Sequence, residues 1–505
     1  MSRRTTRIEQ NSSRVAGVSL SREVLFVMTI CAAQLCVYAG IGQVLPVLRI
    51  TGETFTVTNV SHLAWAVAGY TMMVGAFVLV AGRLGEVFGY KRIFLSGLLW
   101  SAVWSAIAGA SFYSGTALFI VSRALEGSGV ALCLPTGLAL LGATYPTGRR
   151  KAAIFALVAM MAPTGLIVGA AGASALTLAW WPLVYWAFTL TLLGVTCFGA
   201  FTIPNAVNTN KANMSTGSYI GDLDILGMFT GVSSLVLAGF VCIQVPMVGW
   251  QEPYLWVALI CDVLLAVVFV LNERYYAPKP LVPFSAITSE VGVILSVVAC
   301  GWSCFGIWIF YTWQIVEGLE NVSPLLSTAY FSPVLVVGCC AVATMGLTLH
   351  RLGPSITMCI ALFTFMAGSL LIVTMPTTQI YWAQLFVGIL LTAWGMNTCM
   401  PAATLMLSNA VDQKYHSVTS NLVSVVMFYS MALGLGAAGT VEGKVNDNGA
   451  TTRGNLRGYR AAIWTGVGLA GLGFIACLGL SLSLYRRRRV RHCKCHGERG
   501  SHHQI

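Results

Sequence analysis

The chain contains fourteen runs of apolar residues, each close to the length that crosses a bilayer. About 20 apolar residues in a helix span the hydrocarbon core, and runs this long without alternating polarity do not form a barrel. Charged residues make up only 9% of the chain, against about 25% in a soluble domain. The sequence therefore predicts an all-α membrane protein with 14 transmembrane helices. The predicted spans are 24–45, 63–81, 93–112, 116–142, 153–174, 181–203, 223–245, 253–271, 289–315, 328–349, 355–375, 380–406, 418–440 and 460–484.

Positive charges are distributed unevenly over the connections between these runs. Most of the 29 Lys and Arg residues lie in the two tails and in every second connection, and cytoplasmic segments carry this excess of cations. The pattern predicts that both termini are cytoplasmic, in a multi-pass protein that we assign to the plasma membrane. Residues 1–23 form a polar tail without the pattern of a cleavable signal peptide, and 485–505 form a basic tail. Asn59 and Asn321 fall on outer connections and are predicted glycosylation sites.

The connection after the second run, Gly82–Arg92, combines glycines with charged residues. Glycine permits turns and close approach of helix ends, and an acid among cations can change partners when the cytoplasmic side closes. We interpret this stretch as a gating loop, against the alternative of an ordinary Gly-rich basic connection. Its residues are Gly82, Arg83, Gly85, Glu86, Gly89, Lys91 and Arg92.

A weaker copy of this connection, Gly346–Pro354, follows the tenth run. The two copies occupy the same place if the chain has two equivalent halves, and such halves around a central cavity are a transporter plan. The sequence thus predicts two six-helix bundles, at 24–203 and 281–484, with a loop and two inserted helices at 204–280. Chance recurrence in a glycine-rich chain is the alternative.

The fourth run contains two charged residues, Arg123 and Glu126, which their spacing places on one helical face. Charges near the membrane midplane are costly and usually face a cavity or a partner. We interpret the pair as proton-coupling residues, with Glu126 as the candidate proton carrier. A static ion pair that fixes helix packing is the alternative. Asp262 in the eighth run is a further acid, for which packing is the alternative to function.

Polar and aromatic residues inside several runs predict a substrate cavity. Aromatic and amide side chains suit a neutral or cationic organic ligand, through stacking and cation–π contacts. Anchoring of Tyr and Trp at the membrane interface is the alternative. The candidate cavity residues are Gln34, Tyr38, Gln43, Tyr311, Gln314, Trp394 and Asn397.

Other motifs argue against several classes of function. The 15 cysteines lie mostly in apolar runs, where they serve as packing residues rather than as a disulfide framework. The His and Cys residues at 492–496 do not have a zinc-finger spacing, so we predict no metal site and no cofactor. We also expect neither nucleic-acid binding nor enzyme activity, because no basic face on a polar domain and no clustered catalytic motif is visible.

Together these residues resemble the 14-spanner drug:proton antiporters of the major facilitator superfamily, and among them the fungal aminotriazole- and boron-resistance type. Gly82–Arg92 is similar to the loop signature G-x-L-x-D-R-x-G-R-[RK], with Glu86 in place of the Asp, Val87 in place of the first Arg and Tyr90 in place of the second. Arg123–Gly129 matches R-x-x-x-G-x-G, with Glu126 where the family usually has Gln. The resemblance extends from about residue 30 to residue 480.

The fifth run resembles the antiporter motif G-P-x-x-G, with Ala162 in place of the first glycine and the second glycine one residue earlier, at Gly165. The resemblance implies that Pro163, Gly165 and Gly169 form an antiporter kink, at which the fifth and tenth helices pack closely. A plain proline kink with small-residue packing is the alternative. The resemblance also implies that the first and fourth helices of each bundle line the substrate path.

The function implied by the resemblance is secondary active transport by alternating access. We expect a monomer in the lipid bilayer that exports a small organic compound, such as a drug, toxin or secondary metabolite, in exchange for protons. Transport of a small inorganic species such as borate or ammonium is the alternative. A transporter-like membrane sensor is a third hypothesis, although neither tail is long enough to fold independently.

Overall fold

The computed structural model describes residues 20–57, 60–146, 148–204, 223–376, 379–412, 415–446 and 451–501. The predicted N-tail up to residue 19 and the predicted glycosylation site at Asn59 lie outside these ranges. Within them, fourteen helices are long and apolar enough to cross a membrane, as the sequence predicts.

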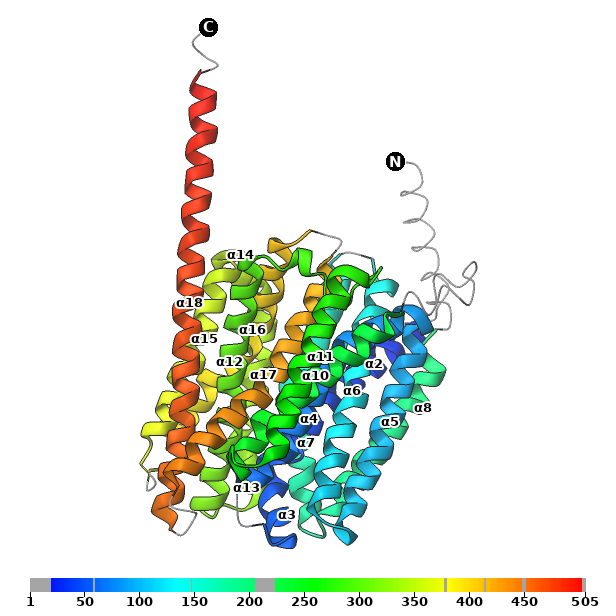
Figure 1. The fold of residues 1–505 in the computed structure, drawn as a ribbon, viewed down its shortest axis with the longest axis vertical. Coiled ribbons are helices and arrows are strands. Elements are labelled where there is room, and N and C mark those ends of the chain that lie inside the picture. The colour runs from blue at the N-terminus through cyan, green and yellow to red at the C-terminus, as the bar shows by residue number, and fades with distance from the viewer. Residues whose placement is uncertain are drawn as a thin grey trace.

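The described chain is almost entirely helical (Figure 1). The first six spans are formed by α2 (Leu20–Gly42), α4 (Val60–Phe88), α5 (Tyr90–Ala110), α6 (Thr116–Thr144), α7 (Arg149–Thr177) and α8 (Pro182–Thr202). Two further helices follow, α10 (Ile225–Val248) and α11 (Pro253–Leu271), and α11 continues as the π-helix η5 (Asn272–Tyr276). The last six spans are α12 (Ser289–Gln314), α14 (Pro333–Leu352), α15 (Pro354–Thr374), α16 (Gln384–Ala410), α17 (His416–Val445) and α18 (Thr452–Ser501).

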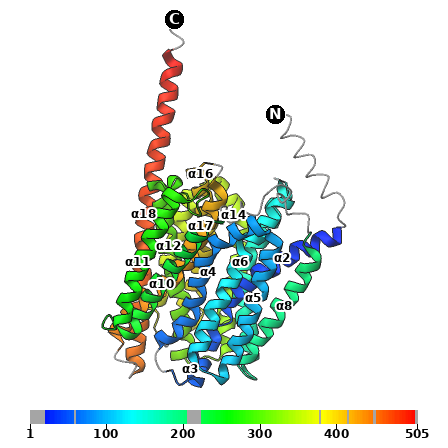
Figure 2. The same cartoon turned by 45° about the vertical axis from the view of Figure 1, so that its right-hand side comes forward.

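Short elements complete the helices at one end of the molecule. They are η1 (Leu45–Val47) and α3 (Leu48–Thr54) after α2, the π-helix η7 (Ile315–Leu319) after α12, and α13 (Pro324–Phe331) before α14. Figure 1 shows α3 and α13 at this end, opposite the end of α18. Figure 2 shows that α2 begins at the same face at which α18 ends, as an even number of crossings requires. We call this the N-terminal face, and the sequence predicts that it is cytoplasmic.

The helices form two six-helix bundles that meet along two helix pairs, α4 with α17 and α7 with α14. Small residues allow both contacts. A Cβ atom on Gly75 of α4 would lie 2.8 Å from the backbone nitrogen of Tyr429 on α17, and one on Gly338 of α14 would lie 2.5 Å from Cβ of Pro163 on α7. The inserted pair packs beside this seam, with α10 against both α4 and α17 and α11 against α10.

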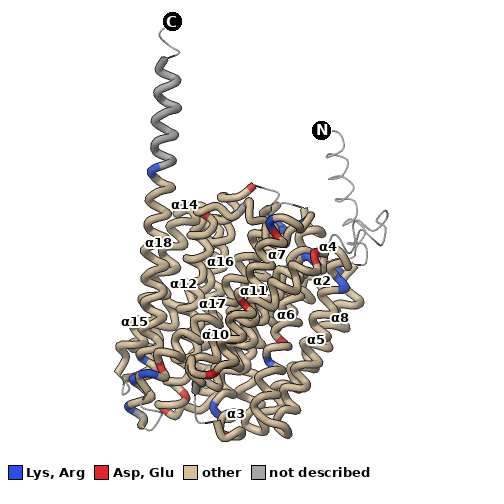
Figure 3. Tube along the Cα trace, viewed as in Figure 1, with Lys and Arg blue, Asp and Glu red and all other residues tan. Residues whose placement is uncertain are grey.

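Most charged residues lie near the two ends of the helices (Figure 3), because placing a charge in hydrocarbon is costly. Two connections between helices are nevertheless shorter than the sequence predicts. Residues 82–88 continue α4 and 90–92 begin α5, so that Gly89 alone separates the two helices, with φ 98°. The predicted outer connection 441–459 is also shorter, because α17 ends at Val445 and α18 begins at Thr452. A helix that continues past the hydrocarbon keeps its backbone hydrogen bonds while long cationic side chains reach water.

Candidate functional site

A cavity of about 540 Å³ lies between the two bundles. It reaches from the middle of α2, at Gln34 and Tyr38, to residues near the N-terminal face, such as Phe155 at the start of α7 and Ser420 at the start of α17. Helices of both bundles line it, and the ring centroids of Tyr38 and Phe428 lie 5.9 Å apart on α2 and α17. Relative movement of the bundles would therefore change its shape.

The lining of this cavity is uncharged. Its polar groups are amides and hydroxyls, among them Gln34 and Asn397, and its apolar surface includes Trp302 and several methionines. Asn397 donates a hydrogen bond from Nδ2 to Ala393 O at 2.9 Å, which fixes the amide on the cavity wall. A few fixed polar groups in an otherwise apolar site of this volume are typical of small organic ligands.

The structure brings only part of the predicted cavity set together. Gln34, Tyr38 and Asn397 line the cavity, whereas Trp394 is half-buried outside it. Gln43, Tyr311 and Gln314 also do not line it, and their side chains are buried in the half of the molecule away from the N-terminal face. This half is closed, so its polar residues pack inside the protein instead of facing a cavity.

The residues of α17 that line the cavity are not among those predicted from the sequence. Ser420 and Asn421 face the cavity on one turn of this helix, Ser424 on the next turn, and Met427 and Phe428 on the turn after that. Three polar residues on one face of an otherwise apolar run are the sequence feature that could have predicted this lining. This helix is the fifth of its bundle, whereas the resemblance implies a path lined by the first and fourth helices.

Contacts between the bundles close the end opposite the N-terminal face. Arg49 of α3 donates from Nη1 to Glu317 O at 2.8 Å and to Asn321 Oδ1 at 3.1 Å, both beyond the end of α12. Ser174 of α7 and Thr328 of α13 share a hydrogen bond of 2.7 Å. The predicted glycosylation site Asn321 therefore carries an interbundle contact, and its side chain is exposed.

Replacing Arg49 with alanine is expected to favour opening at this end. The side chain is 46% exposed, so we assign the lost charge-assisted bonds about 1 kcal/mol, or about fivefold in population. A reporter cysteine in place of Gln43, labelled by an impermeant maleimide from that side, should react about fivefold faster. Glu53→Ala, which removes only the Arg49–Glu53 pair at 3.1 Å, is the control. Equal labelling rates with and without Arg49 would contradict the assignment.

The predicted proton-coupling residues form a sealed ion pair. Arg123 Nη1 lies 2.6 Å from Glu126 Oε2, and both side chains are 0% exposed. Arg123 also donates to Gly40 O of α2 and lies over the Tyr70 ring, with Cζ 4.7 Å from its centroid. Glu126 Oε1 has no partner. The pair lies beside the cavity and not on its wall, so a proton could reach Glu126 only after a movement of α2 or α4.

The predicted kink residues face two different helices. Pro163 packs against Gly338 of α14, across the bundle interface. Gly165 and Gly169 instead pack against the backbone of α2, at Leu35 O and Ala39 O. The expectation that these glycines join the fifth and tenth spans is wrong, because they lie on the face of α7 turned toward its own bundle.

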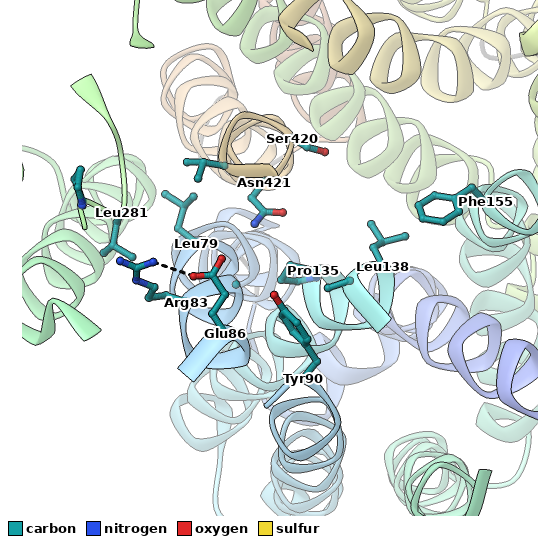
Figure 4. Close-up of a pocket in the computed structure, with 14 residues that line it drawn as sticks. Leu79, Arg83, Glu86, Tyr90, Pro135, Leu138, Phe155, Leu281, Ser420 and Asn421 are labelled. Atoms are coloured by element: carbon teal, nitrogen blue, oxygen red, sulfur yellow. Dashed lines mark hydrogen bonds and ion pairs between the residues drawn. The ribbon is translucent and has the colours of Figure 1, made fainter. Parts of the chain in front are cut away.

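The predicted gating residues lie around a smaller cavity of about 240 Å³ near the N-terminal face (Figure 4). Arg83 Nη1 pairs with Glu86 Oε2 at 2.8 Å, and Arg83 Nη2 donates to Lys279 O at 2.7 Å. Figure 4 shows Arg83 beside Leu281 and Asn421 facing the same space. Gly82, Arg83 and Glu86 line this cavity, whereas Gly85, Gly89, Lys91 and Arg92 do not. Lys91 instead donates to Ala200 O and Ile203 O at the end of α8.

Two six-helix bundles that meet around a central cavity define a membrane transporter. The sequence model of the Major Facilitator Superfamily matches residues 30–438, and the chain belongs to this superfamily. It is therefore a multi-pass membrane protein from a family that transports small molecules.

The chain is 42% identical to a low affinity ammonium transporter of Saccharomyces cerevisiae, over 94% of this chain and 91% of that protein. It is 39% identical to efflux pump terJ of Aspergillus terreus, over 93% and 90%. It is 31% identical to an aminotriazole resistance protein of Saccharomyces cerevisiae, over 93% and 86%.

Among solved structures, a peptide transporter POT in complex with sulfate has a similar fold, with a TM-score of 0.66, 15% identity and coverage of 92% of this chain and 94% of that chain. The predicted fold class and the predicted resemblance to fungal efflux transporters of this superfamily are confirmed.

Proposed function

We propose that this chain is a proton-driven exporter of a small organic compound. In this proposal it acts as a monomer in the plasma membrane, with the N-terminal face toward the cytoplasm. The observation that carries the proposal is the uncharged cavity of about 540 Å³ between the bundles. The likeness to efflux pump terJ supports the direction of transport.

Transport of ammonium is the second candidate, because the relative at 42% identity is named for it. Ammonium is a compact and strongly hydrated ion. Replacement of its water shell needs several oxygen ligands or an acidic group at short range, and none of the residues that line this cavity is Asp or Glu. The size and the aromatic content of the cavity favour an organic compound.

Coupling to protons is proposed for Arg123 and Glu126. A buried ion pair with one carboxylate oxygen left without a partner is costly in a membrane. This cost is consistent with a pair that changes partners during transport. The residues around Arg83 are proposed to close the cytoplasmic side, while the contacts of Arg49 close the outer side.

The experiment that separates the two candidates compares cells that lack this chain with cells that overproduce it. We expect overproduction to raise tolerance to particular toxic organic compounds and to lower their accumulation. Uptake of labelled methylammonium should be unchanged. Altered methylammonium uptake without any change in accumulation of organic compounds would favour the second candidate and contradict the first.

Replacing Gln34 with leucine should weaken binding of substrate from the N-terminal face. Gln34 lines the cavity and donates from Nε2 to Leu134 O at 3.3 Å. Loss of one polar contact to a ligand is expected to raise KM about tenfold, or about 1.4 kcal/mol. Gln43→Leu is the matched control, because Gln43 is buried on the same segment outside the cavity. Equal KM values for the two variants would place the substrate elsewhere.

A further inference from the structure

Two acidic side chains lie together where the inserted helix pair begins and ends, at the start of α10 and at the end of α11. Asp224 caps the start of α10, where its Oδ1 accepts from Gly227 N at 3.1 Å and from Asn272 Nδ2 at 2.7 Å. Glu273 lies in η5 at the end of α11 and is only 4% exposed. Its Oε2 accepts from Val282 N at 3.2 Å. Each carboxyl group thus uses one oxygen atom to hold backbone or amide donors.

The second oxygen atoms of the two groups face one another. Asp224 Oδ2 and Glu273 Oε1 are both buried without a hydrogen-bond donor. Both atoms lie next to Gly227. A Cβ atom on this glycine would overlap Asp224 Oδ2 and would lie 2.8 Å from Glu273 Oε1. The two carboxyl groups are within hydrogen-bonding reach. Two carboxylates at this range repel each other when their facing oxygen atoms are shielded from water, whereas one shared proton satisfies both oxygen atoms.

We propose that Asp224 and Glu273 form a proton-binding site, in which one shared proton keeps the segment Ala277–Pro283 attached to the inserted helices. A metal ion is the weaker choice. It would take several oxygen ligands, and the described part of the chain has no group of three His, Cys, Asp or Glu side chains that could hold one. This site goes beyond the proposed transport function and does not depend on the substrate.

The segment held by this site reaches the predicted gate. Glu273 holds Val282, and three residues earlier Lys279 O accepts the hydrogen bond from Arg83 of α4. Leu281 lines the small cavity beside Arg83 (Figure 4). The segment therefore connects the proton-binding site, at Val282, with the carbonyl group of Lys279 that accepts the hydrogen bond from Arg83.

The remaining charged groups on the elements around the site are few. Among the residues that the structure describes, Arg274 and Lys279 lie on the same stretch, Arg83 and Glu86 on α4, and Asp262 on α11, while α10 carries none; Asp222 lies outside the described ranges. Burial of the Glu273 carboxyl, and after it the Asp224 carboxyl nearby, favour the form of Glu273 that holds a proton. The attached state binds the shared proton, so attachment is favoured at low pH and is lost as pH rises and that proton leaves.

Two measurements on the full-length protein in lipid nanodiscs test this site. In infrared spectra, the C=O band of a protonated carboxylic acid should disappear as pH is raised from about 6 to about 9, and Glu273→Gln should remove this titrating band. In hydrogen exchange, the protection factor of peptide 277–283, corrected for the intrinsic rate, should fall on the order of tenfold over the same range.

Three variants sharpen the test. Glu273→Gln supplies an amide that can donate to Asp224 and accept from Val282, so protection should persist and lose its pH dependence. Gly227→Ala places a methyl group between the two carboxyl groups without changing a charge. It should lower the protection factor of peptide 277–283 on the order of tenfold at all pH values. Asp262→Asn is the matched control, since Asp262 accepts from Ser234 at 2.7 Å within the same helix pair, and it should behave as the parent.

Three results would overturn the proposal. One is an infrared spectrum in which Glu273→Gln retains the full titrating band of the parent. Another is a protection factor of the parent that does not depend on pH. The third is protection that disappears when divalent cations are chelated, which would assign the two acids to a metal ion. Each readout is independent of transport, so its failure is distinguishable from failure of the proposed function.

Discussion

Replacement of Arg123 by alanine is expected to reduce transport to the background of empty membranes. The substitution leaves the Glu126 carboxylate, which is 0% exposed, without its cation, and loss of one partner of a buried pair costs about 3–5 kcal/mol. It also removes the bond from Arg123 to Gly40 O and the contact with the Tyr70 ring, which hold α6 against α2 and α4. Transport in vesicles and the amount of protein in the membrane are the quantities to measure together.

Glu126→Gln separates coupling from packing. The amide keeps the shape of Glu126 and can still accept from Arg123, but it carries no proton to exchange. If Glu126 is the proton carrier, acceleration by a pH gradient should be lost while substrate exchange without a gradient continues. Full acceleration in this variant would assign Glu126 to packing and leave Arg123 as the charged candidate in α6.

Replacement of Gly75 by leucine is expected to stop turnover almost completely. Gly75 of α4 packs directly on the backbone of Tyr429 of α17, and these helices belong to different bundles. A leucine side chain there excludes the observed conformation, through which every transport cycle must pass. We expect a loss of about a hundredfold in turnover, equivalent to about 3 kcal/mol.

Gly172→Leu on α7 is the matched control for this substitution. No atom lies within 4 Å of a Cβ atom on Gly172, outside its own helix and chain neighbours, so the same increase in volume meets open space. Similar turnover in the two variants, at equal amounts in the membrane, would show that the α4–α17 contact does not limit transport.

Local chemistry made the helices and the ion pair predictable from the sequence. A run of about 20 apolar residues has few alternatives to a membrane helix, and the three-residue spacing of Arg123 and Glu126 places both side chains on one face. The helix ends were less predictable. Residues 82–88 remain helical although they contain Arg83 and Glu86, because polar residues at the membrane surface do not require a loop.

The candidate site depended on contacts that no local pattern specifies. Gln34 and Gln43 are both amides on the first span, but only Gln34 faces the cavity, because contacts such as that of Arg49 with Glu317 O close the other half. The spacing of Gly165 and Gly169 predicted a close helix contact without identifying α2 as the partner. Partner choice and the side that is open are properties of the assembled bundles.

The most direct test of proton-driven export uses the purified chain in vesicles with an acidic interior and the N-terminal face outward. The probe is a permanently charged organic cation that the chain exports from cells, since acid trapping cannot accumulate it. We expect the probe to accumulate inside while the internal pH rises, and both effects to disappear when the pH gradient is dissipated or when Arg123→Ala replaces the parent. Equal accumulation with and without the gradient, or no accumulation in either case, would contradict the central claim.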